Sequence, residues 1–188
     1  MALTFIKSAT AAGSPATISF VDGSSDVVFD NTYNEYQFHF VNIHAGTDNA
    51  AFGFQVNATD DAGGGYDTSQ ISSTFFKAEH SEGGSGGSSG YHTASDQGNG
   101  TAYQRMSYSQ QMDADEAFSG VLTIYAPSSS TYVKHFVAKG NYVHHSSHYS
   151  QNTYVAGYIN DTTPIDEIRF AMDSGNIDSG TIHMYGVG

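Results

Sequence analysis

Short runs in which apolar and polar residues alternate recur along the chain, and this period constrains the fold more than any other feature of the sequence. Successive side chains of a strand point to opposite faces of a sheet, so the alternation indicates strands with one buried face. Eight runs have this pattern, at residues 16–20, 36–43, 51–57, 120–126, 132–138, 154–160, 168–172 and 181–186. Clusters of Gly, Asn, Asp and Ser separate them. The sequence therefore predicts an all-β protein of about eight strands.

The apolar positions within these runs define the expected core and the expected class of fold. The side chains predicted to share one face of their strand are Ile18, Phe20, Tyr36, Phe38, Phe40, Phe52, Phe54, Val56, Ile168, Phe170, Met172, Ile182 and Met184. In residues 120–126, Leu122 and Ile124 lie on one face and Val121 and Tyr125 on the other, and the pattern does not decide which face is buried. Short antiparallel strands in this number are typical of a sandwich, and about eight strands in two sheets match a jelly roll. We expect an antiparallel β-sandwich, jelly-roll-like, with long Gly-rich loops. No internal break divides the chain, so we expect a single domain over residues 1–188.

Four connecting segments carry their own expectations. Residues 173–180, DSGNIDSG, are rich in turn formers and should join the last two strands as a hairpin. The final strand would then pair inside a sheet, where its backbone groups are satisfied. Residues 57–67 and 80–100 are polar and Gly-rich, so we expect long loops that are either functional or disordered. Residues 107–118 are the one segment in which we expect a short helix.

The charge balance argues against two classes of partner. The chain has 19 acidic and six basic residues, a formal net charge of −13, which opposes binding to nucleic acid and to anionic lipid surfaces. No apolar stretch approaches the length of a membrane span, and residues 1–15 lack the basic segment of a secretory signal. We therefore expect no nucleic-acid partner, no membrane insertion and no leader. Because there is no cysteine, disulfides make no contribution to the fold.

Histidines concentrate in the run VHHSSHYS, which contains His144, His145 and His148. On a strand His144 and His148 share a face, and on a helix they lie one turn apart, so either structure presents two imidazoles to one ion. Such a site normally needs a third or fourth ligand, and the run contains no acidic residue. We assign no metal to it, and expect these histidines to contact solvent or a neighbouring subunit. Whether they bind a metal stays open.

Acidic residues offer a second candidate for an ion site. Asp113, Asp115 and Glu116 resemble the start of an EF-hand calcium loop, but that loop requires Gly at its sixth position, where this chain has Phe118. A solvated turn or helix start is the simpler interpretation. The spacing of Asp60, Asp61 and Asp67 is also compatible with a looser site. We therefore assign no metal-binding residues in this sequence.

Catalytic motifs are weak or absent. GGSGG at residues 83–87 satisfies the G-x-S-x-G pattern, which exposes a nucleophile only between a strand and a helix. Ser85 is instead surrounded by Gly and Ser, as in a flexible loop over residues 83–90. The chain has no H-E-x-x-H motif, P-loop or dinucleotide fingerprint. We therefore assign no catalytic residue and no cofactor, and expect a protein that is not an enzyme.

Tyrosine is frequent, with 13 residues in a chain that has no tryptophan. Exposed tyrosines stack on sugars and anchor protein interfaces, and Tyr66, Tyr91, Tyr103 and Tyr149 lie in or beside candidate loops. Tyrosine is equally common in ordinary strands, so the count alone does not decide between the two roles.

The C-terminal segment IDEIRFAMDSGNIDSGTIHMYGVG, residues 165–188, resembles the closing segment of structural proteins from tailed bacteriophages, especially marine ones. In that group an I-x-x-I-R-F strand precedes a Ser/Gly-Asn turn and a final S-G-x-I-x-x-Y-G strand. Residues 1–23 and 33–44 are similar to the start of its small free-standing members. The matching positions are Ile168, Phe170, Gly175, Asn176, Ser179, Gly180, Ile182, Tyr185 and Gly186, all interpreted as scaffold residues that specify the hairpin. The chain departs from the group at residues 83–90 and 144–148.

The resemblance implies a virion component with a β-sandwich fold and no catalytic residues to transfer. We therefore expect a non-enzymatic bacteriophage virion structural protein, either a capsid decoration or a tail or fibre component. It would act through contacts between subunits, as a homo-oligomer, for which we expect a trimer, and with other virion proteins. The alternative is a host-recognition module that binds cell-surface glycan through its loop tyrosines, which predicts a shallow aromatic patch on the surface.

Overall fold

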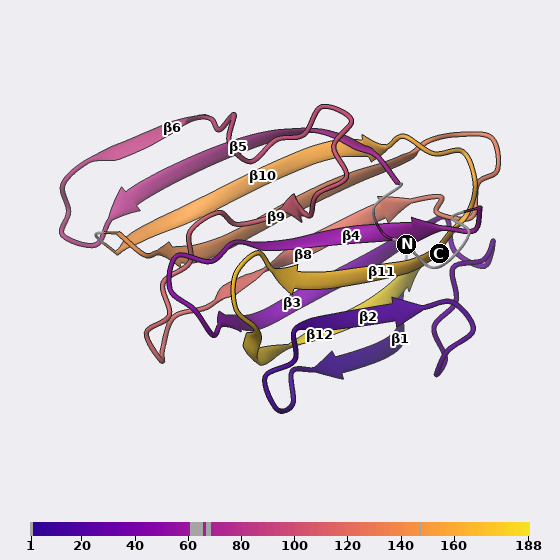
Figure 1. The fold of residues 1–188 in the computed structure, drawn as a ribbon, viewed down its shortest axis with the longest axis horizontal. Coiled ribbons are helices and arrows are strands. Elements are labelled where there is room, and N and C mark those ends of the chain that lie inside the picture. Colours follow the sequence, from indigo (N-terminus) through magenta and orange to yellow (C-terminus); the bar gives the residue numbers. More distant parts are fainter. Residues whose placement is uncertain (1, 61–65, 67–68, 147) are drawn as a thin grey trace.

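The computed structural model of the chain describes residues 2–60, 66, 69–146 and 148–188 (Figure 1). In this part of the chain it has twelve strands and no helix. The strands are β1 (Leu3–Thr10), β2 (Thr17–Val21), β3 (Glu35–Ala45), β4 (Phe52–Ala58), β5 (Ile71–Ser81), β6 (Gly87–Tyr91), β7 (Gln104–Arg105), β8 (Phe118–Tyr125), β9 (Lys134–His144), β10 (Tyr149–Ile159), β11 (Ile165–Met172) and β12 (Ile177–Val187). The structure so described contains no helix long and apolar enough to cross a membrane.

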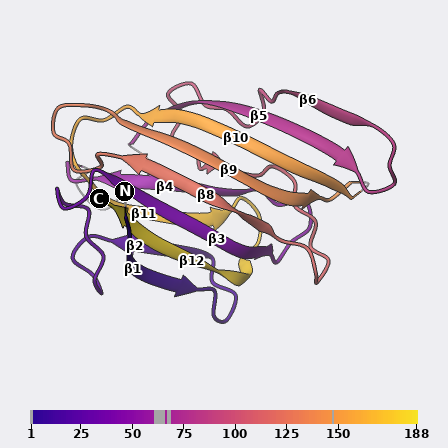
Figure 2. The ribbon, with the colours of Figure 1, turned by 180° about the vertical axis from the view of Figure 1, so that it is seen from behind.

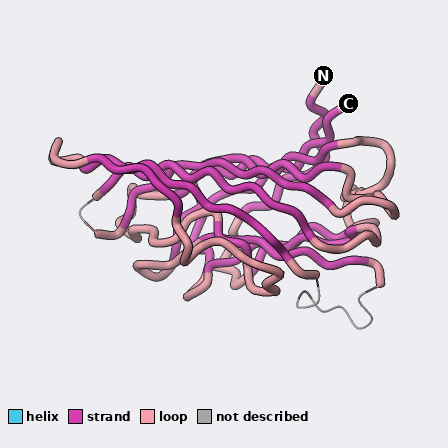
Figure 3. The backbone as a smooth tube through the Cα atoms, turned by 90° about the horizontal axis from the view of Figure 1, so that it is seen from above, coloured by secondary structure: helices cyan, strands magenta, loops and turns pink. Residues whose placement is uncertain are grey.

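The strands form two antiparallel sheets that lie one over the other (Figure 3). The large sheet has eight strands in the order β1-β12-β3-β8-β9-β10-β5-β6, and the small sheet has four in the order β2-β11-β4-β7. The predicted all-β sandwich is therefore confirmed. The jelly roll stays a prediction, because the large sheet has eight strands where an eight-stranded jelly roll divides its strands between two sheets.

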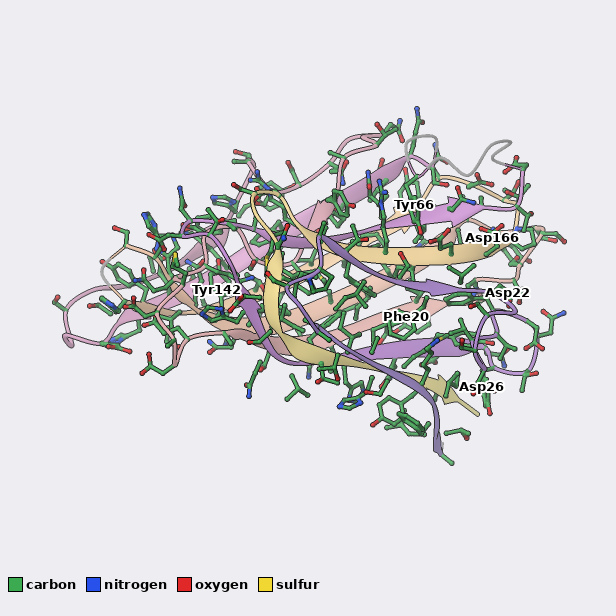
Figure 4. All side chains as sticks on the ribbon, turned by 60° about the horizontal axis from the view of Figure 1, so that its bottom comes forward. Phe20, Asp22, Asp26, Tyr66, Tyr142 and Asp166 are labelled. Atoms are coloured by element: carbon green, nitrogen blue, oxygen red, sulfur yellow. The ribbon has the colours of Figure 1, made fainter. Side chains whose placement is uncertain are left out.

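The core between the sheets consists of the alternating residues that the sequence pattern indicates. All thirteen side chains predicted to share the apolar face of their strand are buried, and in β8 the buried face is that of Leu122 and Ile124. Phe170 of β11 lies at the centre, with its ring centroid 5.3 Å from that of Phe38 and 5.2 Å from that of Phe40, both on the large sheet. Phe20 reaches the same cluster from β2 (Figure 4). Tilted and edge-to-face aromatic pairs of this kind add to the free energy of burial and fix the spacing of the sheets.

The final strand pairs inside a sheet, as expected, but the predicted hairpin is wrong. Strand β12 lies between β1 and β3 in the large sheet, whereas β11 lies between β2 and β4 in the small sheet. Residues 173–176 therefore cross between the layers. Asp173 fixes the start of this crossing, because its Oδ1 accepts a hydrogen bond from the Ala51 N–H at 2.8 Å. Turn residues predict that the chain changes direction, not which sheet receives the next strand.

The expected helix is also wrong, because residues 107–118 form bends, isolated bridges at Gln110 and a single turn. The segment is held on two sides: the Gln110 N–H bonds the carbonyl of Ala50, and the Gln111 N–H bonds that of Val143. A turn follows, in which the Glu116 N–H bonds the Asp113 carbonyl at 2.9 Å. Backbone groups that pair with neighbouring strands are not available for a helix.

Residues 80–100 are likewise not one long loop. Strand β5 continues to Ser81, and residues 87–91 pair with it as β6, the edge strand of the large sheet. Ser85 lies in the turn between these two strands, so the strand-then-helix context of a nucleophile elbow is not present there. In the other predicted loop, Asp61 and Asp67 lie outside the described residues.

Candidate functional site

Figure 2 shows the large sheet from its outer side, away from the small sheet. This face carries a row of large exposed side chains. Tyr154 of β10 lies opposite Phe76 of β5, and Phe76 lies opposite Tyr91 of β6, so the three residues form one line across the strands. Their exposed fractions are 55%, 49% and 44% respectively. The rings of Phe76 and Tyr91 meet edge to face at 5.2 Å. We call these three residues the aromatic row.

The outward positions of β5, β8, β9 and β10 carry no acidic residue. The positions that alternate with the buried ones on β5, β8, β9 and β10, all of which the structure describes, are Ser72, Thr74, Phe76, Ala78, His80, Ser119, Val121, Thr123, Tyr125, His135, Val137, Lys139, Asn141, Val143, Ser150, Asn152, Tyr154, Ala156 and Tyr158. None is Asp or Glu, although the chain has 19 of them. An acidic residue does reach the row from the segment after β6, where the Asp96 carboxylate accepts a hydrogen bond from the Tyr91 hydroxyl.

Two shallow grooves flank the aromatic row. One, of about 220 Å³, passes over the backbone of Gly120 and Gly140 and is walled by Lys139, Asn152 and Tyr154. The other, of about 330 Å³, is lined by small side chains beside Tyr158. Both are open and shallow, which suits an extended ligand or a flat protein surface better than a small enclosed substrate.

A second exposed apolar patch lies at the opposite edge of the same sheet, on β1. Leu3 and Phe5 are about half exposed, and the Phe5 ring contacts the rings of Tyr185 and His183 on β12 at 5.7 and 6.4 Å. We call these four residues the N-terminal patch. Strand β1 pairs only with β12 among the named strands, so its other edge is unpaired within the sheet.

The four loop tyrosines do not form one surface. Tyr66 and Tyr103 both pack against Arg169 of β11, whose guanidinium carbon lies 3.9 and 5.2 Å from their ring centroids. Tyr66 is buried there, near β4 and β11 (Figure 4). Tyr149 is half-buried and lines a hollow of about 170 Å³ with Glu79 and Ser88. Of the four, Tyr91 alone is exposed, and it belongs to the aromatic row.

The fold joins the two candidate ion sites that the sequence presents separately. His148, in the turn between β9 and β10, has its Nε2 3.8 Å from Oδ2 of Asp113 and 3.9 Å from Oε1 of Glu116, in the turn before β8. One ligand atom from each of the three residues lies within 4.8 Å of the others. We call this the Asp113–Glu116–His148 cluster. Asp115 is not part of it, and lines a neighbouring hollow instead.

The remaining candidates have other contacts. The His144 ring packs on Tyr108 with centroids 5.1 Å apart, and His145 Nδ1 lies 3.1 Å from Ser109 Oγ. Burial lowers the pKa of His144. Asp60 accepts a hydrogen bond from the Thr163 hydroxyl at 2.6 Å. The three histidines of the run therefore do not converge on one point.

A polar network that the sequence does not signal lies under β5 and β10. The Lys77 ammonium donates hydrogen bonds to Glu79 and to the Tyr108 hydroxyl, each at 2.8 Å. Glu79 also accepts hydrogen bonds from the Ser88 hydroxyl at 2.7 Å and from the amide nitrogen of Gln151. The amide oxygen of Gln151 accepts a hydrogen bond from the Tyr142 hydroxyl. The polar atoms are satisfied by one another, which indicates a structural role.

Comparisons with protein-family models, with curated proteins and with solved structures found no match to this chain.

Proposed function

We propose that this chain is a non-enzymatic structural protein of a bacteriophage virion that acts through subunit–subunit contacts. The observation that carries the proposal is the aromatic row on the outer face of the large sheet, where the outward positions of β5, β8, β9 and β10 carry no carboxylate. The three adjacent rings are about half exposed. Covering them with another surface lowers the free energy of the system by about 25 cal/mol per Å² of apolar area buried. Contiguous exposed apolar patches mark interaction surfaces in soluble proteins.

Charge supports a contact between copies of the chain. Each copy carries a formal charge of −13, so two copies repel one another in most orientations. The outer face of β5, β8, β9 and β10 is the exception, because its outward positions include Lys139, His80 and His135 and no carboxylate. Covering this face with a second copy places few like charges together.

Two different patches on one sheet favour a ring over a dimer. A self-complementary patch generates a two-fold dimer, whereas two patches that fit each other generate a closed ring when the rotation permits. The aromatic row and the N-terminal patch lie towards opposite edges of the large sheet, since β6 and β1 are its edge strands. We propose that the aromatic row of one copy packs against the N-terminal patch of the next, in a homotrimer.

The resemblance of residues 165–188 to tailed-phage structural proteins supports a place in the virion. We propose a position on the capsid surface or in the tail or fibre, where the loops outside the ring contacts would meet other virion proteins.

A second candidate function is binding of host cell-surface glycan. The groove beside Tyr154 favours it, because an aromatic ring next to Asn152 and Lys139 offers a sugar both a stacking face and hydrogen-bond donors. This site would lie on the sheet face and would use Tyr154 in place of the loop tyrosines.

The test is sedimentation equilibrium of three variants. Phe76→Ser/Tyr154→Ser removes the aromatic row, Leu3→Ser/Phe5→Ser removes the N-terminal patch, and Tyr132→Ser is the control, because Tyr132 is 73% exposed and lies outside both. We expect each double variant to be monomeric and the control to keep the wild-type mass. A mixture of the two double variants retains one intact contact, so we expect it to form a two-chain complex.

Two results would contradict the proposal. If the aromatic-row variant keeps the wild-type mass, that face is not a contact between copies. Wild-type binding on a glycan array that the same variant loses would then favour the second candidate.

A further inference from the structure

We propose that Asp113, Glu116 and His148 bind a divalent first-row transition-metal ion of the Zn²⁺ type. The site is separate from the aromatic row and from the N-terminal patch, and does not depend on the proposed function. Its ligands come from two turns that are more than thirty residues apart in the sequence and that the fold places side by side.

Unpartnered buried acceptors are the strongest sign of a cation. Oε2 of Glu116 is buried and has no hydrogen-bond partner among the described residues, and the Glu116 side chain is only 11% exposed. The Gln111 amide donates to Asp113 Oδ2 at 3.1 Å, while its own Oε1 is buried and equally unpartnered. Glu116 Oε2 and Gln111 Oε1 are thus both buried without a hydrogen-bond donor. Burial of two such acceptors raises the free energy of the folded state unless an ion or water satisfies them.

The electrostatics of the cluster also favour a cation. Burial raises the pKa of Glu116, and the negative charges of Asp113, Asp115 and Glu82 raise it further, against the opposing effect of His148. A bound divalent ion would offset both the desolvation of Glu116 and the repulsion among these carboxylates.

The ligand set indicates the class of ion. Carboxylate oxygens alone suit calcium and magnesium, whereas an added imidazole nitrogen favours zinc and other first-row transition metals. Ligands at about 2.1 Å from a tetrahedral ion lie about 3.4 Å from one another. The His148 nitrogen is 3.8 and 3.9 Å from the two carboxylates, and all three ligand atoms lie within 4.8 Å of one another, so rotations of the exposed His148 and Asp113 side chains would bring them to binding distance. The three protein ligands leave a position for water or for the Gln111 oxygen.

Such an ion would fasten two parts of the large sheet together. Asp113 and Glu116 precede β8, and His148 lies in the β9–β10 turn, where its carbonyl accepts a hydrogen bond from the Glu82 N–H at 3.2 Å. Because the ion binds the folded arrangement and not the unfolded chain, it would raise the free energy of unfolding in proportion to its affinity and concentration.

The test is calorimetric titration of chelator-treated protein with ZnCl₂ and, separately, with CaCl₂. The variants are Glu116→Gln, which keeps the shape and removes the charge, and His148→Asn, because asparagine tolerates the positive φ of 47° at this position. His80→Asn, an exposed histidine on β5, is the matched control. Thermal unfolding without metal checks that each variant is folded.

We expect one zinc ion per wild-type chain and weaker calcium binding. Each cluster variant should lose zinc affinity by about tenfold or more, with no change in the control. Zinc should raise the unfolding temperature of the wild type and not that of Glu116→Gln. Without metal Glu116→Gln should be at least as stable as the wild type, because it removes a largely buried carboxylate that neighbouring carboxylates repel.

The proposal is overturned if the wild type binds no zinc. It is also overturned if both cluster variants bind zinc as tightly as the wild type, because the ion would then be bound by other residues. Tighter binding of calcium than of zinc that His148→Asn leaves unchanged would also overturn it, since the imidazole would then not be a ligand.

Discussion

The guanidinium carbon of Arg169 lies 3.9 Å from the centre of the Tyr66 ring. The same guanidinium donates two hydrogen bonds to Oε1 of Gln55, at 2.7 and 3.1 Å, and thereby links β11 to β4. Tyr103 packs beside it. Tyr66 and Tyr103, two of the tyrosines considered for ligand stacking, therefore pack over the outer side of the small sheet and stabilise it.

Arg169→Lys should destabilise the protein by about 1–2 kcal/mol, because an ammonium cannot bond Gln55 in a fork and stack on a ring at once. The control is Arg105→Lys, which alters a partly exposed ion pair with Asp173 and should cost about 0–1 kcal/mol. Urea unfolding of both variants measures the difference. Equal costs would mean that the stacked arrangement contributes nothing.

Gly180 is required by the backbone at the start of β12. Its φ is +116°, and a Cβ there would lie 2.5 Å from the carbonyl oxygen of Asn42 on β3. Gly180→Ala should therefore cost about 2–4 kcal/mol, from strain and overpacking together. Gly23→Ala is the control, since Gly23 also has positive φ but no atom within 4 Å of the added Cβ, and should cost about 1 kcal/mol. A similar loss in both variants by urea unfolding would refute the clash.

Glu79 should make the free energy of unfolding depend on pH in acidic solution. Burial alone would raise its pKa, but the hydrogen bonds from Lys77, Ser88 and Gln151 outweigh burial and hold the pKa below its ordinary value of 4.5. A carboxyl with a lowered folded-state pKa contributes stability above its unfolded value, and that contribution is lost as the pH falls through the folded value.

Glu79→Gln should thus destabilise the protein at neutral pH, by about 1–3 kcal/mol, and the difference from wild type should shrink progressively as the pH falls below 4.5. Glu35→Gln, at the end of β3, is the control. Unfolding curves over this range decide the matter: a difference that stays constant with pH would show that the carboxylate charge is not what stabilises the network.

Local alternation predicts strands well where one face is apolar. Strand β3 is the clearest case, with Tyr36, Phe38 and Phe40 buried and polar residues between them. Strand β5 does not show this alternation because its inward positions include Lys77 and Glu79, which the polar network satisfies. Strand β6 does not show it because all five of its residues are exposed, so nothing in its Gly and Ser pattern indicates a core.

Long-range relationships are the part that the sequence does not reveal. The residues around 175 show that the chain turns, but the assignment of β11 and β12 to different sheets depends on pairing with β4 and β3, far away in the chain. His148 and Glu116 are also separated in sequence, and each belongs to a run that is incomplete as an ion site on its own. Only the fold shows that the two runs meet.

The native mass of the unmodified protein, measured by light scattering at several concentrations and two salt strengths, decides whether copies of the chain assemble. We expect a stable species of three times the chain mass of 20.0 kDa, held by the apolar patches and therefore not weakened by added salt. A mass of 20.0 kDa at every concentration would contradict the proposal that the outer face of the large sheet joins copies of this chain.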